Sequence, residues 1–146
     1  MAGDGGAVEQ VMLSFSEEDD PNSSFFYLDR IHSAQEHDDI ITGIVLTADK
    51  SKLVTASYDK SFVVLEKESL RIVSRVSAAH TDLINTLAAN PFNTNTIATA
   101  GNDGKVLTWD LRKAGNTEAK PTSMSCTYLY IFNNKKAAFK KFPTGD

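Results

Sequence analysis

Cysteine is almost absent from this sequence of 146 residues, in which Cys126 is the only one. A single cysteine excludes an internal disulfide and any metal site built from a cluster of cysteine ligands, and it fits a reducing compartment. Apolar runs of membrane-spanning length are also lacking. The first residues have neither a positively charged region nor a long apolar core, so we expect no secretory signal. The expected location is the cytoplasm, with the nucleus left open.

An excess of positive charge is lacking as well. The chain has 15 Lys and Arg against 19 Asp and Glu, a net charge of −4, which gives no general attraction to nucleic acid. A G-x-S-x-G nucleophile motif is missing, and the sequence contains neither a phosphate-binding loop nor a convincing set of metal ligands. We therefore expect a protein that acts through protein partners, without enzymatic activity, cofactor or metal.

One stretch, residues 80–112, organises the rest of the chain. Its sequence, HTDLINTLAANPFNTNTIATAGNDGKVLTWDLR, includes His80, Thr99, Asp103 and Trp109. The turn-forming residues around Asp103 separate two runs of β-forming residues, which predicts a hairpin. A hydrolase triad is an alternative for a histidine, a hydroxyl and a carboxylate. We disfavour it, because the pattern includes a tryptophan that a triad does not need.

A less complete copy of this stretch precedes it. His37 lies 43 residues before His80, and both Thr55 and Asp59 lie 44 residues before their counterparts. The copy has Leu65-Glu66 where the later stretch has Trp-Asp, so it lacks an indole donor. Self-similarity at about 40–45 residues is typical of propeller proteins, in which each repeat contributes four strands.

Together these residues and spacings resemble the WD40 repeat. The resemblance implies an all-β fold of WD40 β-propeller blades, with two recognisable repeats that form an incomplete ring, since propellers close with about four to eight blades. It also implies a structural tetrad in which the Asp103 carboxylate accepts a hydrogen bond from His80, His80 is bonded to the Thr99 hydroxyl, and that hydroxyl is bonded to the Trp109 indole. Such a closed network satisfies buried polar groups and fixes one strand register. In the earlier copy, the resemblance implies a partial tetrad of His37, Thr55 and Asp59.

The expected organisation of the chain has five parts. They are a flexible acidic leader at 1–24, an outer strand of a preceding blade at 25–36, a WD40 repeat at 37–79 with Leu-Glu in place of Trp-Asp, a second repeat at 80–125, and a basic aromatic tail at 126–146. The tail has lysines between aromatic residues, which fits either binding to RNA or acidic lipid or a segment outside the propeller. We favour the second interpretation of the tail.

A narrower resemblance concerns function. The sequence EHDDIIT at 36–42 leads into the first repeat, and the stretch 78–112 followed by a linker with Lys-Pro completes the second. These segments resemble the WD40 subunits of the methylosome. That resemblance implies a non-catalytic adaptor, which binds a protein arginine methyltransferase and helps present histone or Sm protein substrates.

An alternative comes from the end of the second repeat. Trp109-Asp110-Leu111-Arg112 resembles the WDxR signature of substrate receptors for cullin-type ubiquitin ligases. In those receptors the arginine helps bind the ligase adaptor, so the resemblance implies an adaptor contact at Arg112. The sequence leaves open which protein partner the chain binds.

Overall fold

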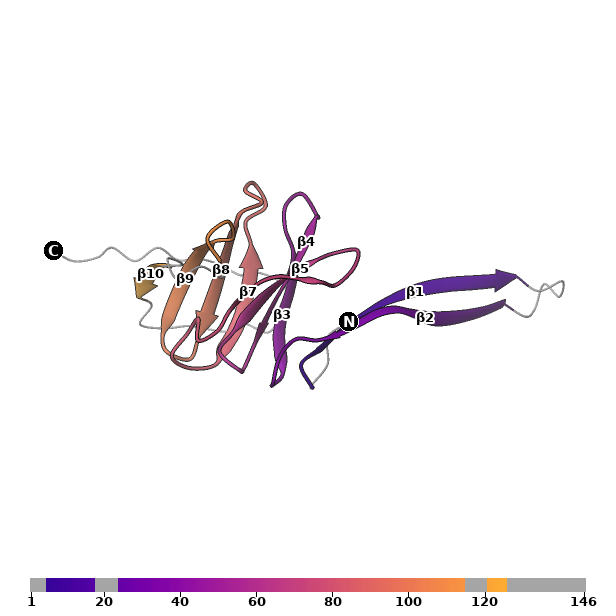
Figure 1. Cartoon of the computed structure of the whole chain (residues 1–146), viewed down its shortest axis with the longest axis horizontal. Coiled ribbons are helices and arrows are strands. Elements are labelled where there is room, and N and C mark those ends of the chain that lie inside the picture. The colour runs from indigo at the N-terminus through magenta and orange to yellow at the C-terminus, as the bar shows by residue number, and fades with distance from the viewer. Residues whose placement is uncertain (1–4, 18–23, 115–120, 126–146) are drawn as a thin grey trace.

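The computed structural model describes residues 5–17, 24–114 and 121–125, and within these ranges every regular element is a β-strand. The strands form three antiparallel sheets (Figure 1). In chain order they are β1 (Ala7–Glu17), β2 (Ser24–Gln35), β3 (Ile41–Leu46), β4 (Lys52–Ser57), β5 (Phe62–Glu66), β6 (Ile72–Val76), β7 (Ile84–Ala89), β8 (Thr96–Gly101), β9 (Lys105–Asp110) and β10 (Thr122–Ser125). The all-β prediction is confirmed, and the tail at 126–146 lies outside the described residues.

Two of the sheets have four strands and the same topology. The first sheet has the order β3-β4-β5-β6, and the second has β7-β8-β9-β10. Both have an irregularity in the register of their first strand, between Ile41 and Gly43 and between Ile84 and Thr86. Ile84 lies 43 residues after Ile41, and Thr86 lies 43 residues after Gly43. The sequence repeat is therefore also a repeat of backbone geometry. The two sheets fall within the ranges 37–79 and 80–125 expected for the repeats.

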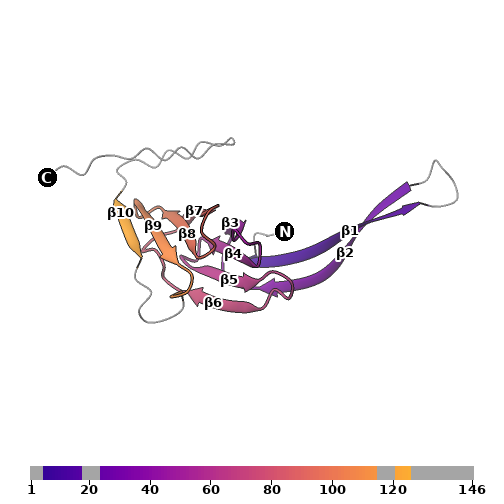
Figure 2. The same cartoon turned by 90° about the horizontal axis from the view of Figure 1, so that it is seen from above.

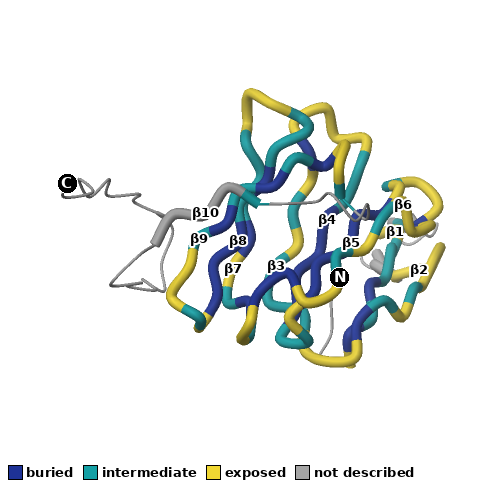
Figure 3. Tube along the Cα trace, turned by 60° about the vertical axis from the view of Figure 1, so that its left-hand side comes forward, coloured by how far each residue is buried: buried dark blue, intermediate teal, exposed yellow. Residues whose placement is uncertain are grey.

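The main apolar core lies between the first and the second sheet. Figure 3 shows the buried stretches along β4, β5 and β8, with exposed loops at the ends of the strands. Phe62 of the first sheet and Trp109 of the second pack edge to face, with ring centroids 5.0 Å apart and planes at 61°, a favourable geometry for aromatic pairs. The inner strands approach closely: a Cβ on Gly43 would lie 2.9 Å from the Leu87 Cβ.

The opposite face of the first sheet packs against a two-stranded hairpin. β1 and β2 pair along their whole length, from Ala7 opposite Gln35 to Glu17 opposite Ser24. Near the base of this hairpin, Val8 is buried with Val63 and Leu65 in a second apolar cluster. Farther along, the hairpin runs away from the sheets (Figure 2).

The hairpin differs from what the sequence suggested at the N-terminus. We expected a flexible leader at 1–24, but residues 7–17 form β1, while residues 1–4 and 18–23 lie outside the described part. The physical reason is that β1 pairs with β2 in a hairpin and that Val8 is buried against Val63 and Leu65, which lie far from it in the sequence. The strand expected at 25–36 corresponds to β2 (Ser24–Gln35), and within the described residues β1 is its partner.

Candidate functional site

The second sheet contains a buried chain of four polar side chains, which are the four that the spacing singled out. His80 Nδ1 lies 2.9 Å and 3.0 Å from the two carboxylate oxygens of Asp103. His80 Nε2 lies 2.8 Å from the Thr99 hydroxyl, and the Trp109 indole N–H donates to the same hydroxyl at 2.9 Å. His80, Thr99 and Trp109 are all buried, so each of these contacts satisfies a group that water does not reach.

The donors and acceptors of this chain permit one consistent direction. An ionised carboxylate only accepts hydrogen bonds, so His80 carries its proton on Nδ1 and donates it to Asp103. With a neutral imidazole, His80 Nε2 then accepts from the Thr99 hydroxyl, whose oxygen in turn accepts from the Trp109 indole. Every step has one donor and one acceptor, and the network is therefore complete within the protein.

Asp103 stays ionised because its hydrogen bonds outweigh its burial. Burial alone would raise the pKa of Asp103, but hydrogen bonds from His80 and from the backbone N–H groups of Thr81 and Lys105 lower it overall. The backbone bonds are 3.1 Å each. One carboxylate thus ties together the segment before β7, the turn after β8 and the start of β9.

Local backbone geometry makes room for this arrangement. Gly101 ends β8 beside the imidazole, where a Cβ would lie 2.7 Å from His80 Nδ1. Gly104 follows Asp103 with a φ of 73°, a left-handed conformation that glycine adopts without steric cost. The turn residues that predicted a hairpin therefore also place the carboxylate against the histidine.

The first sheet has the same network without its indole. His37 Nδ1 lies 2.9 Å from Asp59 Oδ2, and His37 Nε2 lies 2.8 Å from the Thr55 hydroxyl. Leu65 is fully buried on β5 at the position that matches the tryptophan. Burial would raise the pKa of Asp59, but hydrogen bonds from Ser61 and His37 lower it overall.

Ser61 is a member of this network that the sequence analysis missed. Its hydroxyl donates to Asp59 Oδ1 at 2.6 Å and lies 3.0 Å from His37 Nδ1. Its backbone N–H donates to the same carboxylate oxygen at 2.9 Å. An Asp-x-Ser sequence in a tight turn is the available signal, because a hydroxyl two residues after an aspartate can close back on it.

These histidine–aspartate pairs are inaccessible to a substrate. His37 and His80 are each 2 % exposed, and the hydroxyls beside them are also buried. Their bonds are used within the sheets, so the arrangement fixes strand register rather than presenting a reactive group. Within the described ranges, no three His, Cys, Asp or Glu residues are grouped so that they could hold a metal ion, and no helix there is long and apolar enough to cross a membrane.

Arg112, the expected adaptor contact, lies at the surface just after β9. Its guanidinium donates to both carboxylate oxygens of Asp110, from Nε at 2.9 Å and from Nη2 at 2.6 Å, while its side chain is 70 % exposed. The hydrogen bond from Arg112 lowers the pKa of Asp110 to about 2. Arg112 and Asp110 therefore form an exposed, bidentate ion pair.

A surface formed by two loops was not foreseen from the sequence. The loop at 47–51 joins β3 to β4, and the loop at 90–95 joins β7 to β8. The two lie at the same end of their sheets (Figure 1) and are joined by the backbone N–H of Asp49, which donates to Thr94 Oγ1 at 2.9 Å. Phe92 stands on the second loop with 96 % of its surface exposed. We call residues 47–51 and 90–95 the loop surface.

Comparison with known proteins places the repeat in a family. Residues 72–110 match the pattern described as WD40, "WD domain, G-beta repeat". The chain is 36% identical over 83 residues to "WD repeat-containing protein 55" of Pongo abelii, a match that covers 57% of this chain and 21% of that protein. It is 33% identical over 78 residues to "Methylosome protein WDR77" of Xenopus laevis, covering 53% of this chain and 23% of that protein. The chain thus spans about a fifth of the length of these relatives.

A solved structure shares the architecture. One chain of the "Crystal Structure of Mitotic Checkpoint Complex" superimposes with a TM-score of 0.58 at 17% sequence identity, over 67% of this chain and 29% of that chain. At this identity the likeness concerns the fold. The matched pattern at 72–110 starts in β6 and ends in β9, so the sequence repeat is offset by one strand from the sheet.

Proposed function

The chain carries repeats of the WD40 family, and on that premise we propose that it is a non-catalytic scaffold, which binds a protein arginine methyltransferase and helps present histone or Sm protein substrates. The similarity to "Methylosome protein WDR77" over 78 residues supports the choice of partner. The buried networks support the non-catalytic role, because their histidines, hydroxyls and carboxylates are used to hold strands together. Binding then falls to exposed loops, which usually carry the contacts of such scaffolds.

The loop surface is the part of the chain that we propose for partner contact. An aromatic side chain that is 96 % exposed, as Phe92 is, contributes little to the stability of its own fold. Aromatic residues are enriched among the contacts that dominate protein interfaces. The bond between Asp49 and Thr94 holds the two loops together, so Phe92 is presented from an ordered support.

Affinity purification tests the proposal. The tagged 146-residue chain would be recovered from cells, and the proteins that accompany it would be identified by mass spectrometry, with the Phe92→Ser variant as a matched sample. We expect an arginine methyltransferase and Sm proteins with the unaltered chain and a clear loss of both with Phe92→Ser. Equal recovery with both chains would refute the role of the loop surface, and absence of a methyltransferase from both would refute the partner. Imaging the same tagged chain would test the expected cytoplasmic location.

A second candidate function rests on Arg112. Its exposed, oriented guanidinium is compatible with the adaptor contact that the WDxR resemblance implies for a cullin-type ubiquitin ligase. Under this alternative, the purification recovers a ligase adaptor in place of a methyltransferase. Substitution of Arg112 by alanine would then abolish that recovery and leave the Phe92-dependent contacts unchanged.

A further inference from the structure

Phe92 is more exposed than any other large apolar side chain among the residues that the structure describes. Burial of an aromatic side chain is one of the larger favourable contributions to folding, and Phe92 makes almost none, since 96 % of its surface is in water. Single exposed apolar residues are common on protein surfaces, so exposure alone does not mark a site. The further evidence lies in how the loop holds Phe92.

The backbone on both sides of Phe92 is fixed by side chains of its own loop. The Phe92 N–H donates to Asn90 Oδ1 at 2.9 Å, and the Asn95 N–H donates to Asn93 Oδ1 at 3.0 Å. Each bond closes a turn in which an asparagine side chain takes the part of a backbone carbonyl. At the base of the loop, the Asn90 N–H donates to the Thr96 carbonyl at 3.0 Å. The ring is therefore presented from an ordered backbone.

Neighbouring units of the chain are joined through backbone carbonyls near the two network histidines. The carbonyl of Lys60 in the first sheet accepts hydrogen bonds from the backbone N–H groups of residues 79 and 80 at 2.8 Å and 3.5 Å. The carbonyl of Gly6, just before the hairpin, accepts equivalent bonds from residues 36 and 37 at 3.2 Å and 3.1 Å. These links are made by the main chain, so no side-chain substitution removes them directly.

At the loop surface, by contrast, the link between the two sheets uses a side chain. The backbone N–H of Asp49 donates to Thr94 Oγ1 at 2.9 Å. The loop of Asp49 is itself braced, because its carboxylate accepts from the Thr47 hydroxyl at 2.7 Å and from the Ser51 hydroxyl at 2.9 Å. The bonds from Thr47 and Ser51 hold the pKa of Asp49 well below its ordinary value. Thr94 thus fastens the loop of Phe92 to an ordered neighbour.

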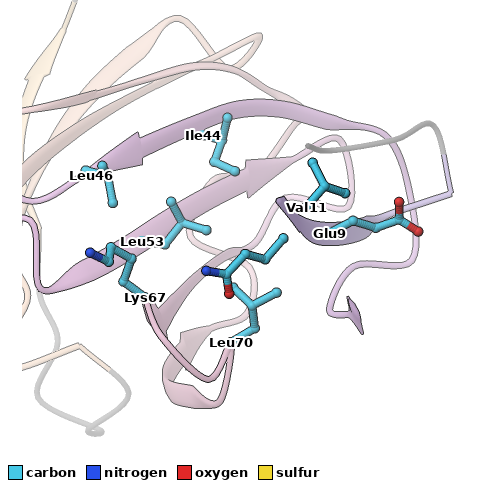
Figure 4. Close-up of a pocket in the computed structure, with 8 residues that line it drawn as sticks. Glu9, Val11, Ile44, Leu46, Leu53, Lys67 and Leu70 are labelled. Atoms are coloured by element: carbon cyan, nitrogen blue, oxygen red, sulfur yellow. The ribbon is translucent and has the colours of Figure 1, made fainter. Parts of the chain in front are cut away.

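Other exposed apolar residues lie in a concave part of the surface. Ile44 and Leu46 of β3 are 40 % and 41 % exposed, and with Leu53 of β4 they line a groove of about 300 Å³ (Figure 4). Phe92 lines no part of this groove, and it stands on a loop that projects beyond the ends of β7 and β8 (Figure 1). A protruding ring on an ordered loop has the shape to enter a cavity of another molecule.

The chemistry around Phe92 selects a cavity that is apolar and has a neutral rim. Residues 90–95 have the sequence NPFNTN, which contains no charged side chain. Pro91 fixes the backbone φ angle next to the ring. On the neighbouring loop, the carboxylate of Asp49 is already satisfied by the hydroxyls beside it. A contact centred on Phe92 should therefore gain its affinity from burial of the ring rather than from charge.

We propose that Phe92 is a preorganised anchor, which inserts its ring into an apolar cavity on the protein partner, and that Thr94 is a positioning residue for this anchor. The inference rests on the scaffold role proposed above and adds the chemistry of the partner surface, a concave apolar site with a neutral rim. A rigid anchor has little conformational freedom to lose on binding, which favours affinity. Aromatic side chains that fill such cavities dominate the binding energy of many interfaces.

Photocrosslinking from position 92 tests the anchor in the full 146-residue chain. The photoreactive analogue p-benzoylphenylalanine replaces Phe92 in one sample and, in the control, Val73 on β6, which is 52 % exposed and lies outside the loop surface. The chains would be expressed in cells and irradiated in lysates at about 0.1 M and about 1 M NaCl, at which charges are screened beyond about 10 Å and about 3 Å. Mass spectrometry would identify the crosslinked residues. We expect position 92 alone to crosslink to one protein, at residues that line an apolar cavity, with equal yield at both salt concentrations.

Substitution of Thr94 tests its positioning role with the same readout. In the chain that carries the analogue at position 92, Thr94→Ala removes the acceptor of the Asp49 N–H. We expect the crosslinking yield to fall by about threefold or more, and Thr94→Ser, which keeps a hydroxyl, to restore it. Far-UV circular dichroism would verify that all of these chains keep their fold. An unchanged yield with Thr94→Ala, or an equal fall with both variants, would overturn the role of Thr94.

The identity of the crosslinked protein separates the anchor from the choice of partner. A salt-insensitive crosslink to an apolar cavity of an arginine methyltransferase would support both, whereas the same result with a different protein would support the anchor and refute the methyltransferase. Absence of a crosslink from position 92, the same crosslink from position 73, or loss of the crosslink at high salt would overturn the anchor. A crosslink within the chain or between two copies would also overturn it. So would sedimentation of the unaltered chain with vesicles of phosphatidylcholine and phosphatidylserine that Phe92→Ser abolishes, because the ring would then bind lipid.

Discussion

The Thr99 hydroxyl holds two buried partners at once, and its removal should cost more than removal of the equivalent Thr55 hydroxyl. Thr99→Val keeps the shape of the side chain but leaves both the Trp109 indole N–H and His80 Nε2 without a partner. Thr55→Val leaves only His37 Nε2 without its hydroxyl donor, because β5 has a leucine in place of the tryptophan. The two threonines are 1 % and 0 % exposed, so water cannot replace either hydroxyl.

The magnitude follows from the number of groups left unsatisfied. A buried polar group that loses its partner costs about 1–3 kcal/mol. We therefore expect Thr55→Val to lower the free energy of unfolding by about 1–3 kcal/mol and Thr99→Val to lower it by about 2–6 kcal/mol. The larger loss is a major fraction of the total for a typical domain, which is about 5–15 kcal/mol.

A double-mutant cycle isolates the contribution of the indole. In a Trp109→Phe background no indole N–H is left to be orphaned, so Thr99→Val should cost about as much there as Thr55→Val costs in the unaltered chain, about 1–3 kcal/mol. Urea unfolding of all variants would be followed by far-UV circular dichroism, which does not rely on Trp109. If Thr99→Val is unfolded without urea, the comparison would be made in a stabilising osmolyte.

Two results would refute this reasoning. The first is an equal loss of stability in Thr99→Val and Thr55→Val. The second is a cost for Thr99→Val that does not fall in the Trp109→Phe background. Either would mean that the indole bond at 2.9 Å carries no stabilisation of its own.

Three further predictions concern pH, surface charge and the hairpin. Asp59 and Asp103 have pKa values below the ordinary 3.8 in the folded chain, so the stabilisation from their carboxylates is complete above about pH 4 and is lost as the pH falls through the lowered values. Asp103→Asn should therefore flatten the acid limb of a stability-versus-pH curve measured by circular dichroism. An unchanged acid limb would contradict the role of this carboxylate. Arg112→Ala should leave the midpoint of urea unfolding nearly unchanged, because the pair with Asp110 is exposed. A clear fall of the midpoint would show that the pair is structural. Gly6→Ala places a side chain at a position of positive φ, and its Cβ overlaps the His37 carbonyl. Hydrogen exchange should therefore become faster at the amides of Glu36 and His37, while the second sheet stays protected. Unchanged exchange at those two amides would contradict the anchoring by Gly6.

Much of the sheet architecture could be predicted from the sequence, because it depends on local patterns of residues. β4, β8 and β9 each consist of β-forming residues that lie between turn residues, and this pattern is visible without knowledge of the strand partners. The positions of His80, Thr99, Asp103 and Trp109 follow from turn chemistry and spacing, which fix where these side chains meet. The structure brings all four together.

The rest depends on contacts that no local pattern encodes. We assigned β1 to the leader because an acidic segment separates it from β2. Val8, which packs the base of the hairpin against the first sheet, is apolar like many other residues. The exposure of Phe92 and the approach of the two loops of the loop surface are properties of the three-dimensional structure. Ser61 was missed because serine in a turn is common, and only the structure shows that its hydroxyl reaches the carboxylate of Asp59.

The carbonyls of Gly6 and Lys60 have a consequence for how the chain folds. Each carbonyl belongs to one unit, yet it binds the backbone at the histidine that begins the network of the next unit. Order in the β1–β2 hairpin therefore favours order at His37, and order in the first sheet favours order at His80. The free energy of folding of such an array is approximately the sum of the stability of each unit and the energy of each interface between neighbouring units. Unfolding should therefore begin in the outer units, and a substitution in the β1–β2 hairpin should alter the stability of the second sheet only through its effect on the first sheet.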